Sequence, residues 1–99
     1  MPARWEWTSF DLTKSQKLTG VVKETKWERD QLATAKIEIA GKTYDVMLGF
    51  PVRLEFRRLV VEDVKPGVAI TIEAVPSKQN PNDLRAQIIT VGKETVDAR

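Results

Sequence analysis

Three large aromatic rings lie close together near the start of the chain, at Trp5, Trp7 and Phe10. They precede the first strand-like pattern, and Trp5 and Trp7 fall on the same side of an extended segment. Exposed rings are costly in water, so this arm either folds over an open end of its own domain or packs against another molecule. Packing on its own domain is the favoured interpretation, and all three rings are candidate binding residues.

A second candidate for ligand contact is the segment 76–83, which its Pro, Asn and Asp residues identify as a loop. Lys78, Gln79 and Asn80 lie in its middle. Because loops held by a rigid scaffold often carry recognition, these three residues are predicted to face a ligand. The alternative is a plain flexible turn without a binding role.

The chain contains no His and no Cys. Ser-His and Cys-His nucleophilic pairs, thiol redox chemistry and the usual zinc or copper sites are therefore excluded. The acids are scattered, with Glu62-Asp63 as the only adjacent pair, so neither a calcium loop nor a catalytic carboxylate pair stands out. We expect a protein that is not an enzyme and that uses no cofactor and no metal.

Positive charge gathers at Arg53, Arg57 and Arg58. Arg53 and Arg57 are one helical turn apart, a spacing that an anion site on a helix would use. Glu55 and Glu62 are within pairing distance of Arg58 on the same helix. A solvated, internally paired surface is therefore the favoured interpretation of this cluster.

Length and composition place the chain among single globular domains, with 99 residues, 41% hydrophobic and 30% charged. The net charge of +2 is spread along the sequence and identifies no partner. Apolar runs are too short for a transmembrane helix. No apolar stretch follows residues 1–4, so we expect either a cytosolic protein or one whose signal peptide has been removed.

Alternation of apolar and polar residues predicts five strands, the elements that must position these side chains. They span 18–27, 33–39, 44–48, 68–74 and 84–88. Gly20 lies where the first strand bends or admits another backbone. The short link between the second and third strands predicts an antiparallel hairpin.

The apolar period changes after the third strand, and 51–62 is predicted as a short helix. Its apolar face should consist of Val52, Phe56, Leu59 and Val60.

This order of elements predicts an all-β fold, a small OB-fold-like barrel of five strands with one short helix between strands 3 and 4. An SH3-like barrel is the competing architecture. The domain is expected to span 13–92, preceded by an aromatic arm at 1–12 and followed by a polar tail at 93–99.

OB-fold barrels bind single-stranded nucleic acid or saccharides on the face of their second and third strands. The outward side chains of those strands are predicted to be Thr34, Lys36, Glu38, Asp45 and Met47. None of them is aromatic, and Glu38 and Asp45 repel phosphate. Nucleic acid is therefore not the favoured ligand.

Short motifs along three quarters of the chain carry a family resemblance. They are Ser9-Phe10-Asp11, 18–24 with Trp27, Leu48-Gly49 with Pro51 and Leu54, Arg57-Arg58, 64–67 and 74–76. In their order and spacing the chain resembles a family of small exported bacterial proteins of unknown function with OB-like barrels. The resemblance implies a periplasmic or otherwise exported location and supplies no activity.

The chain departs from that family where the family has histidines. Trp7-Thr8 replaces a His pair, and 28–31 replaces an Asn-Pro-His motif. The resemblance therefore implies no metal or ligand role that depends on histidine.

The sequence thus predicts a non-enzymatic binding or accessory module. Its partner is expected to be a protein or a small ligand, bound through the aromatic arm or an adjacent opening of the barrel. A single-stranded nucleic-acid-binding OB domain is the alternative. The oligomeric state stays open.

Overall fold

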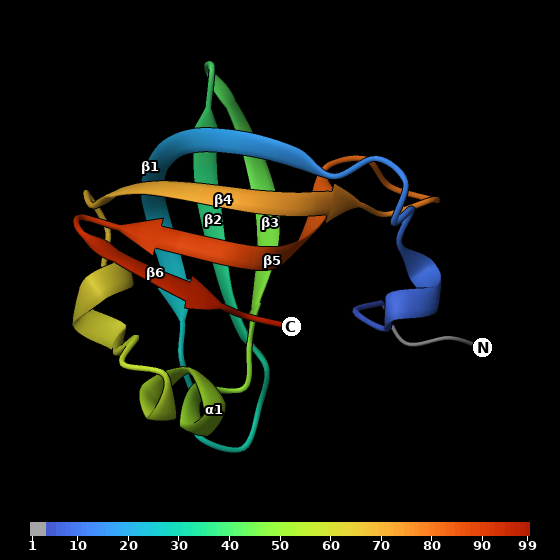
Figure 1. The fold of residues 1–99 in the computed structure, drawn as a ribbon. Coiled ribbons are helices and arrows are strands. Elements are labelled where there is room, and N and C mark those ends of the chain that lie inside the picture. Colours follow the sequence, from blue (N-terminus) through green and yellow to red (C-terminus); the bar gives the residue numbers. More distant parts are fainter. Residues whose placement is uncertain (1–3) are drawn as a thin grey trace.

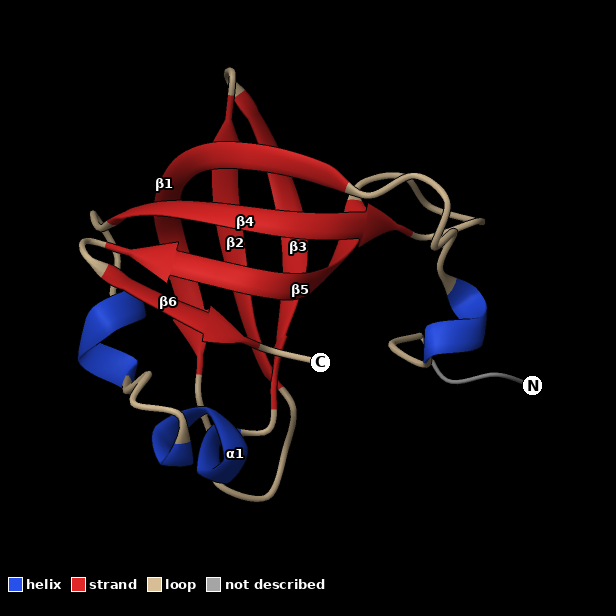
Figure 2. Cartoon of the chain, viewed as in Figure 1, coloured by secondary structure: helices blue, strands red, loops and turns tan. Residues whose placement is uncertain are grey.

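The computed structural model describes residues 4–99, so the first three residues of the predicted arm lie outside the described part. The described residues form six strands, one α-helix and two short 3-10 helices (Figures 1 and 2). The strands are β1 (Gln16–Lys26), β2 (Ala33–Ile39), β3 (Lys42–Gly49), β4 (Ala69–Pro76), β5 (Asp83–Val91) and β6 (Glu94–Asp97). The helices are η1 (Trp7–Ser9), α1 (Pro51–Phe56) and η2 (Val61–Val64).

Five of the strands close into a barrel, which confirms the predicted fold class. Antiparallel pairing joins β1 to β2 and β4, β2 to β3, and β4 to β5. A short parallel pairing of β3 with β5, in which Val46 is opposite Leu84, closes the circle. The long β1 takes part in both halves, because its first residues pair with β4 and its last with β2 (Figure 1).

Gly20 lies in β1 where the two pairings meet, and a side chain has no room there. A Cβ at this position would lie 2.3 Å from the backbone oxygen of Glu38. The prediction that this glycine admits another backbone is therefore confirmed.

The hairpin of β2 and β3 forms as predicted. Ala40 and Gly41 both have positive φ, at 52° and 82°, which two-residue hairpin turns of type I′ require. The alternation of β2 places Ala33, Ala35, Ile37 and Ile39 in the core.

The helix is shorter than predicted and buries a different face. α1 ends at Phe56, and Arg58 takes a positive φ of 71°. The Leu59 N–H then donates to the Leu54 carbonyl at 2.9 Å, a Schellman ending that turns the chain back. Leu54 and Leu59 are buried in the core as a result.

The predicted apolar helix face is wrong for the same reason. Phe56 and Val52 are 89% and 62% exposed, and Val60 is also exposed, so only Leu59 of the predicted set is buried. Continuous helical spacing no longer applies after the chain reverses at Arg58.

Residues 93–99 are not a free tail. β6 pairs with β5 from Val91 opposite Glu94 to Ile88 opposite Asp97, and Val96 is buried in the core. β3 and β6 pair with the same edge of β5, β3 at residues 83–85 and β6 at residues 88–91. β6 therefore continues the sheet beyond the end of the β3 pairing. No helix in the described residues is long and apolar enough to cross a bilayer.

Candidate functional site

The aromatic arm packs on its own barrel. Phe10 is 2% exposed and forms an isolated antiparallel bridge with Ser77. Backbone N–H groups of Asp11 and Lys78 donate to the carbonyls of Pro76 and Ser9, both at 2.9 Å. The arm thereby continues the end of β4, beside the loop that leads to β5 (Figure 1).

Ring and guanidinium contacts hold the rest of the arm. Trp5 stacks on Phe10 with ring centroids 6.2 Å apart. The guanidinium carbon of Arg85, on β5, lies 3.5 Å from the centroid of the Trp7 ring, and its Nη1 donates to the Trp5 carbonyl. A guanidinium above an aromatic face at this distance makes a favourable cation–π interaction.

Salt bridges of Arg4 attach the arm to the barrel. Its Nε and Nη2 donate to the two carboxylate oxygens of Asp83 at 2.7 and 2.6 Å. Asp83 is only 4% exposed, so this bidentate pair supplies the charge partner that a buried carboxylate needs. Arg4 Nη2 also reaches Asp45 on β3 at 3.2 Å.

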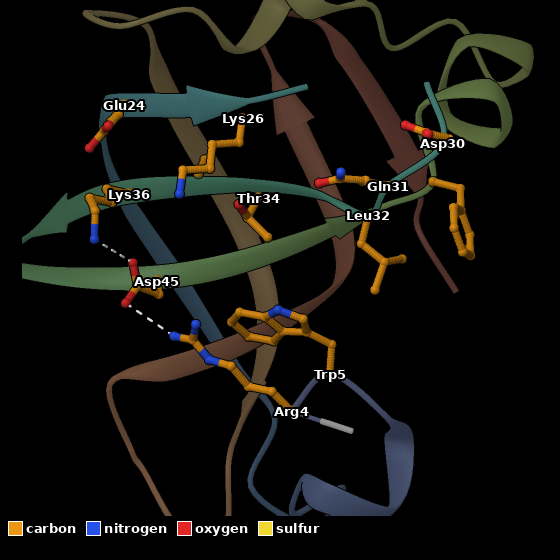
Figure 3. Close-up of a pocket in the computed structure, with 12 residues that line it drawn as sticks. Arg4, Trp5, Glu24, Lys26, Asp30, Gln31, Leu32, Thr34, Lys36 and Asp45 are labelled. Carbon is orange, nitrogen blue, oxygen red and sulfur yellow. Dashed lines mark hydrogen bonds and ion pairs between the residues drawn. The ribbon is translucent and has the colours of Figure 1, made fainter. Parts of the chain in front are cut away.

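This attachment creates an open pocket of about 600 Å³ between the arm and the outer face of β1, β2 and β3 (Figure 3). Trp5 and Arg4 border it from the arm, while Thr34, Lys36 and Asp45 project from β2 and β3. The remaining lining residues are Glu24, Lys26, Asp30, Gln31, Leu32, Ala35 and Phe50.

Asp45 is the electrostatic centre of the pocket. Lys36 Nζ donates to its Oδ1 at 2.9 Å, and Arg4 contacts its Oδ2. The Lys36 hydrogen bond, more than the charges around it, lowers the pKa of Asp45 below its ordinary value. The same hydrogen bond raises the pKa of Lys36.

Charges along the whole pocket balance. The three cations Arg4, Lys26 and Lys36 face the three carboxylates of Glu24, Asp30 and Asp45. The site therefore offers hydrogen-bond donors and acceptors in similar number, without a field that selects one sign of ligand charge.

The aromatic arm and the loop 76–83 lie side by side, but the six predicted site residues do not share the pocket. Of the three predicted aromatic residues only Trp5 lines the pocket, because Trp7 is covered by Arg85 and Phe10 is buried. The loop residues 78–80 are exposed and lie outside the pocket lining, with the Ser77 hydroxyl accepting from the Gln79 and Asn80 N–H groups.

The outer face of β2 and β3 agrees only in part with the prediction. Thr34, Lys36 and Asp45 face the pocket as expected, and Glu38 is exposed, but Met47 is buried. None of these strand residues is aromatic, as predicted, but the arm brings the Trp5 ring to this face.

No sequence pattern singles out Arg4 or Lys26 as a site residue. Arg4 meets Asp83 across 79 positions of the chain, and no local pattern reports so distant a pair. Lys26 is one of many scattered lysines until the fold places it in the lining of the same pocket as Trp5.

The arginines of α1 do not form the predicted pairs. Arg58 makes no ion pair with Glu55 or Glu62 in the described residues. Arg53 and Arg57 instead donate to backbone oxygens at the end of the chain.

Residues 4–99 contain no group of three or more carboxylates placed to hold a metal ion. In comparisons with known proteins the chain matches no family model, and no curated protein or solved structure matches it either.

Proposed function

We propose that this protein is a non-enzymatic binding module that holds a small polyhydroxylated ligand, such as a saccharide, in the pocket beside Trp5. The observation that carries the proposal is the Trp5 ring at the border of a pocket whose charges balance. Phe10 and Arg4 contact the indole, which remains partly exposed. An apolar face of the ligand can pack on the exposed part, while its hydroxyls find donors in Lys26 and Lys36 and acceptors in Asp45.

Pocket size supports the same class of ligand. About 600 Å³ is within the range of small-molecule sites, which runs from about 300 to 1,000 Å³. The arm is already fastened to its own barrel through Arg4 and Phe10, which favours a small ligand over a protein partner seated on the rings.

The barrel supports this assignment by analogy. Strand neighbours β1-β2-β3-β5-β4, with the parallel contact between β3 and β5 and a helix after β3, are the arrangement expected of an OB-fold. Such barrels bind sugars and nucleic acids on the face where this pocket lies.

Single-stranded nucleic acid is the second candidate, and Trp5 is the observation that favours it. A base can stack on the exposed part of the indole, with Lys36 in the same pocket as a cation for the phosphates. Glu24, Asp30 and Asp45 oppose this use, because each carboxylate repels the nucleic-acid backbone.

An exported location belongs to the proposal and rests on the family resemblance alone. Fractionation of the native cells, with the mature N-terminus determined by mass spectrometry, tests it. Recovery of an unprocessed protein in the cytosol would refute it.

A glycan array followed by calorimetry tests the binding function. Trp5→Ala should lower the affinity for the selected saccharide by about tenfold or more, as expected for the loss of an aromatic anchor. Lys36→Gln removes a donor from the pocket and should also weaken binding. Lys23, an exposed lysine of β1 outside the pocket lining, provides the matched control. Lys23→Gln should bind the saccharide as the unaltered protein does.

Salt separates the two candidates. Saccharide binding should change little with ionic strength, whereas oligonucleotide binding should fall steeply as counterions compete. If an oligonucleotide binds more tightly than any saccharide does, and its affinity falls steeply with salt, nucleic-acid binding becomes the favoured function. If no saccharide binds, or if Trp5→Ala binds unchanged, the first is wrong.

A further inference from the structure

A second, smaller cavity lies between α1 and the strands β5 and β6. Its volume is about 80 Å³, the liquid volume of roughly two to three water molecules. Three arginines line it, Arg53 and Arg57 from α1 and its end, and Arg85 from β5. Leu32 and Phe50 line both this cavity and the larger pocket, so the two are neighbours.

One carboxylate, that of Asp97, also lines the cavity and offsets part of the charge of the three arginines. Arg53 Nη2 donates to the Arg99 backbone oxygen at 2.6 Å, and Arg57 Nη1 donates to backbone oxygens of Asp97 and Arg99. The Asp97 carboxylate lies 3.9 Å from Arg57 but is hydrogen-bonded to Arg99, which lowers the pKa of Asp97 to about 2.

Arg85, one of the lining residues, has an unsatisfied donor. Its Nε is buried and has no hydrogen-bond partner in the described structure. Burial, and then the charge of Arg53, lower the pKa of its guanidinium. A buried donor without an acceptor is unfavourable, and so are like charges packed together. Three arginines and one carboxylate line the cavity, so its lining keeps an excess of positive charge.

We infer that this cavity binds an oxyanion, a phosphate or a carboxylate group, between Arg53, Arg57 and Arg85. Guanidinium groups match the planar oxygen pairs of both ions and bind them with charge-assisted hydrogen bonds. The oxyanion accepts from the free Arg85 Nε and offsets the repulsion between Arg53 and Arg85.

The oxyanion has two sources, a free ion or an anionic group on a ligand seated in the larger pocket. Because Leu32 and Phe50 line both cavities, a ligand in the larger pocket can extend an anionic group into the smaller one. Titration with inorganic phosphate and with glucose 6-phosphate distinguishes them. If the sugar phosphate binds more tightly and Trp5→Ala removes only that advantage, the group belongs to a ligand of the larger pocket.

Inorganic phosphate at constant ionic strength, with chloride as the balancing ion, is the direct test. Binding is followed by amide NMR shifts and by Trp emission, because Arg85 lies on the Trp7 ring. Arg53→Gln and Arg57→Gln should each weaken binding about tenfold or more, as expected for loss of a charged hydrogen bond.

Arg58→Gln is the matched control, since this exposed arginine follows the same helix but does not line the cavity. It should bind phosphate as the unaltered protein does. Arg85→Gln also loses the contact with Trp7, so its thermal unfolding is measured alongside. No saturable phosphate shift, or equal weakening by Arg53→Gln and Arg58→Gln, would overturn the inference while leaving the saccharide site untouched.

Discussion

Asp45 connects two elements through one carboxylate, accepting from Lys36 of the neighbouring strand and from Arg4 of the arm. Its pKa is lowered in the folded protein, mainly by the Lys36 hydrogen bond. The unfolded chain therefore binds more protons than the folded protein in acid. The stabilisation is present above the ordinary pKa and is lost as pH falls through the lower folded value.

We predict that Asp45→Asn reduces the loss of stability between about pH 5 and about pH 2. Urea unfolding across this range measures it. Lys36→Gln should flatten the same region, and the double variant should add little to either single change because the two groups share one hydrogen bond. Part of the slope should persist, since Asp97 also has a lowered pKa.

Leu54 and Phe56 test which face of α1 is buried. Leu54 is almost fully buried, whereas Phe56 is 89% exposed. Leu54→Ala should cost about 2 to 5 kcal/mol of unfolding free energy, and Phe56→Ala should stay within about 0.5 kcal/mol. Chemical denaturation of the two variants compares them directly. A larger loss for Phe56→Ala would restore the helix face that the sequence pattern predicts.

Single side chains were predictable where strand alternation controls them. Period two alone places Thr34, Lys36 and Asp45 on the outer face, and the pocket uses all three. The pairing of Arg4 with Asp83 and the position of Trp5 depend on how the arm returns to the barrel, which no periodicity encodes.

Among the elements, α1 shows why a helix end escapes a sequence pattern. A Schellman ending commonly has glycine at the residue of positive φ, but Arg58 holds that place here. The apolar spacing continues past it to Leu59, so the pattern predicts a longer helix. The backbone hydrogen bonds of Leu59 and Arg58 end the helix instead.

The strand β6 was missed because Val96 is the one apolar residue that it buries among polar neighbours. We predict that Val96→Ala costs about 2 kcal/mol, from the lost methyl groups and the space they leave. Thr95→Ala, exposed on the same strand, is the control and should change stability far less. If both variants unfold at the same denaturant concentration, residues 94–97 do not contribute to the core.

At the scale of the whole molecule, the barrel depends on contacts between distant parts of the sequence. The three-residue pairing of β3 with β5 joins 45–47 to 83–85, and the helix lies between them in the chain. Element order and period were enough to predict this architecture, because a helix between the third and fourth of five strands fits few small folds.

Closure of this kind predicts slow folding. Folds dominated by pairing between distant strands acquire their structure in milliseconds to seconds, since the loops must close before the contacts form. Stopped-flow refolding followed by Trp emission should give a single phase in that range. Folding within microseconds would mean that local contacts, and not the β3–β5 closure, limit the rate.

Arg57, at the end of α1, also affects the tendency of the protein to self-associate. β6 is the last strand of the sheet in the described residues, and an open strand edge invites another chain to add to it. Ala98 N–H points into the sheet, toward the Gln87 carbonyl, so the Asp97 carbonyl points outward. Arg57 Nη1 already donates a hydrogen bond to that carbonyl. The chain thus covers its own exposed edge with a charged side chain, which opposes edge-to-edge aggregation.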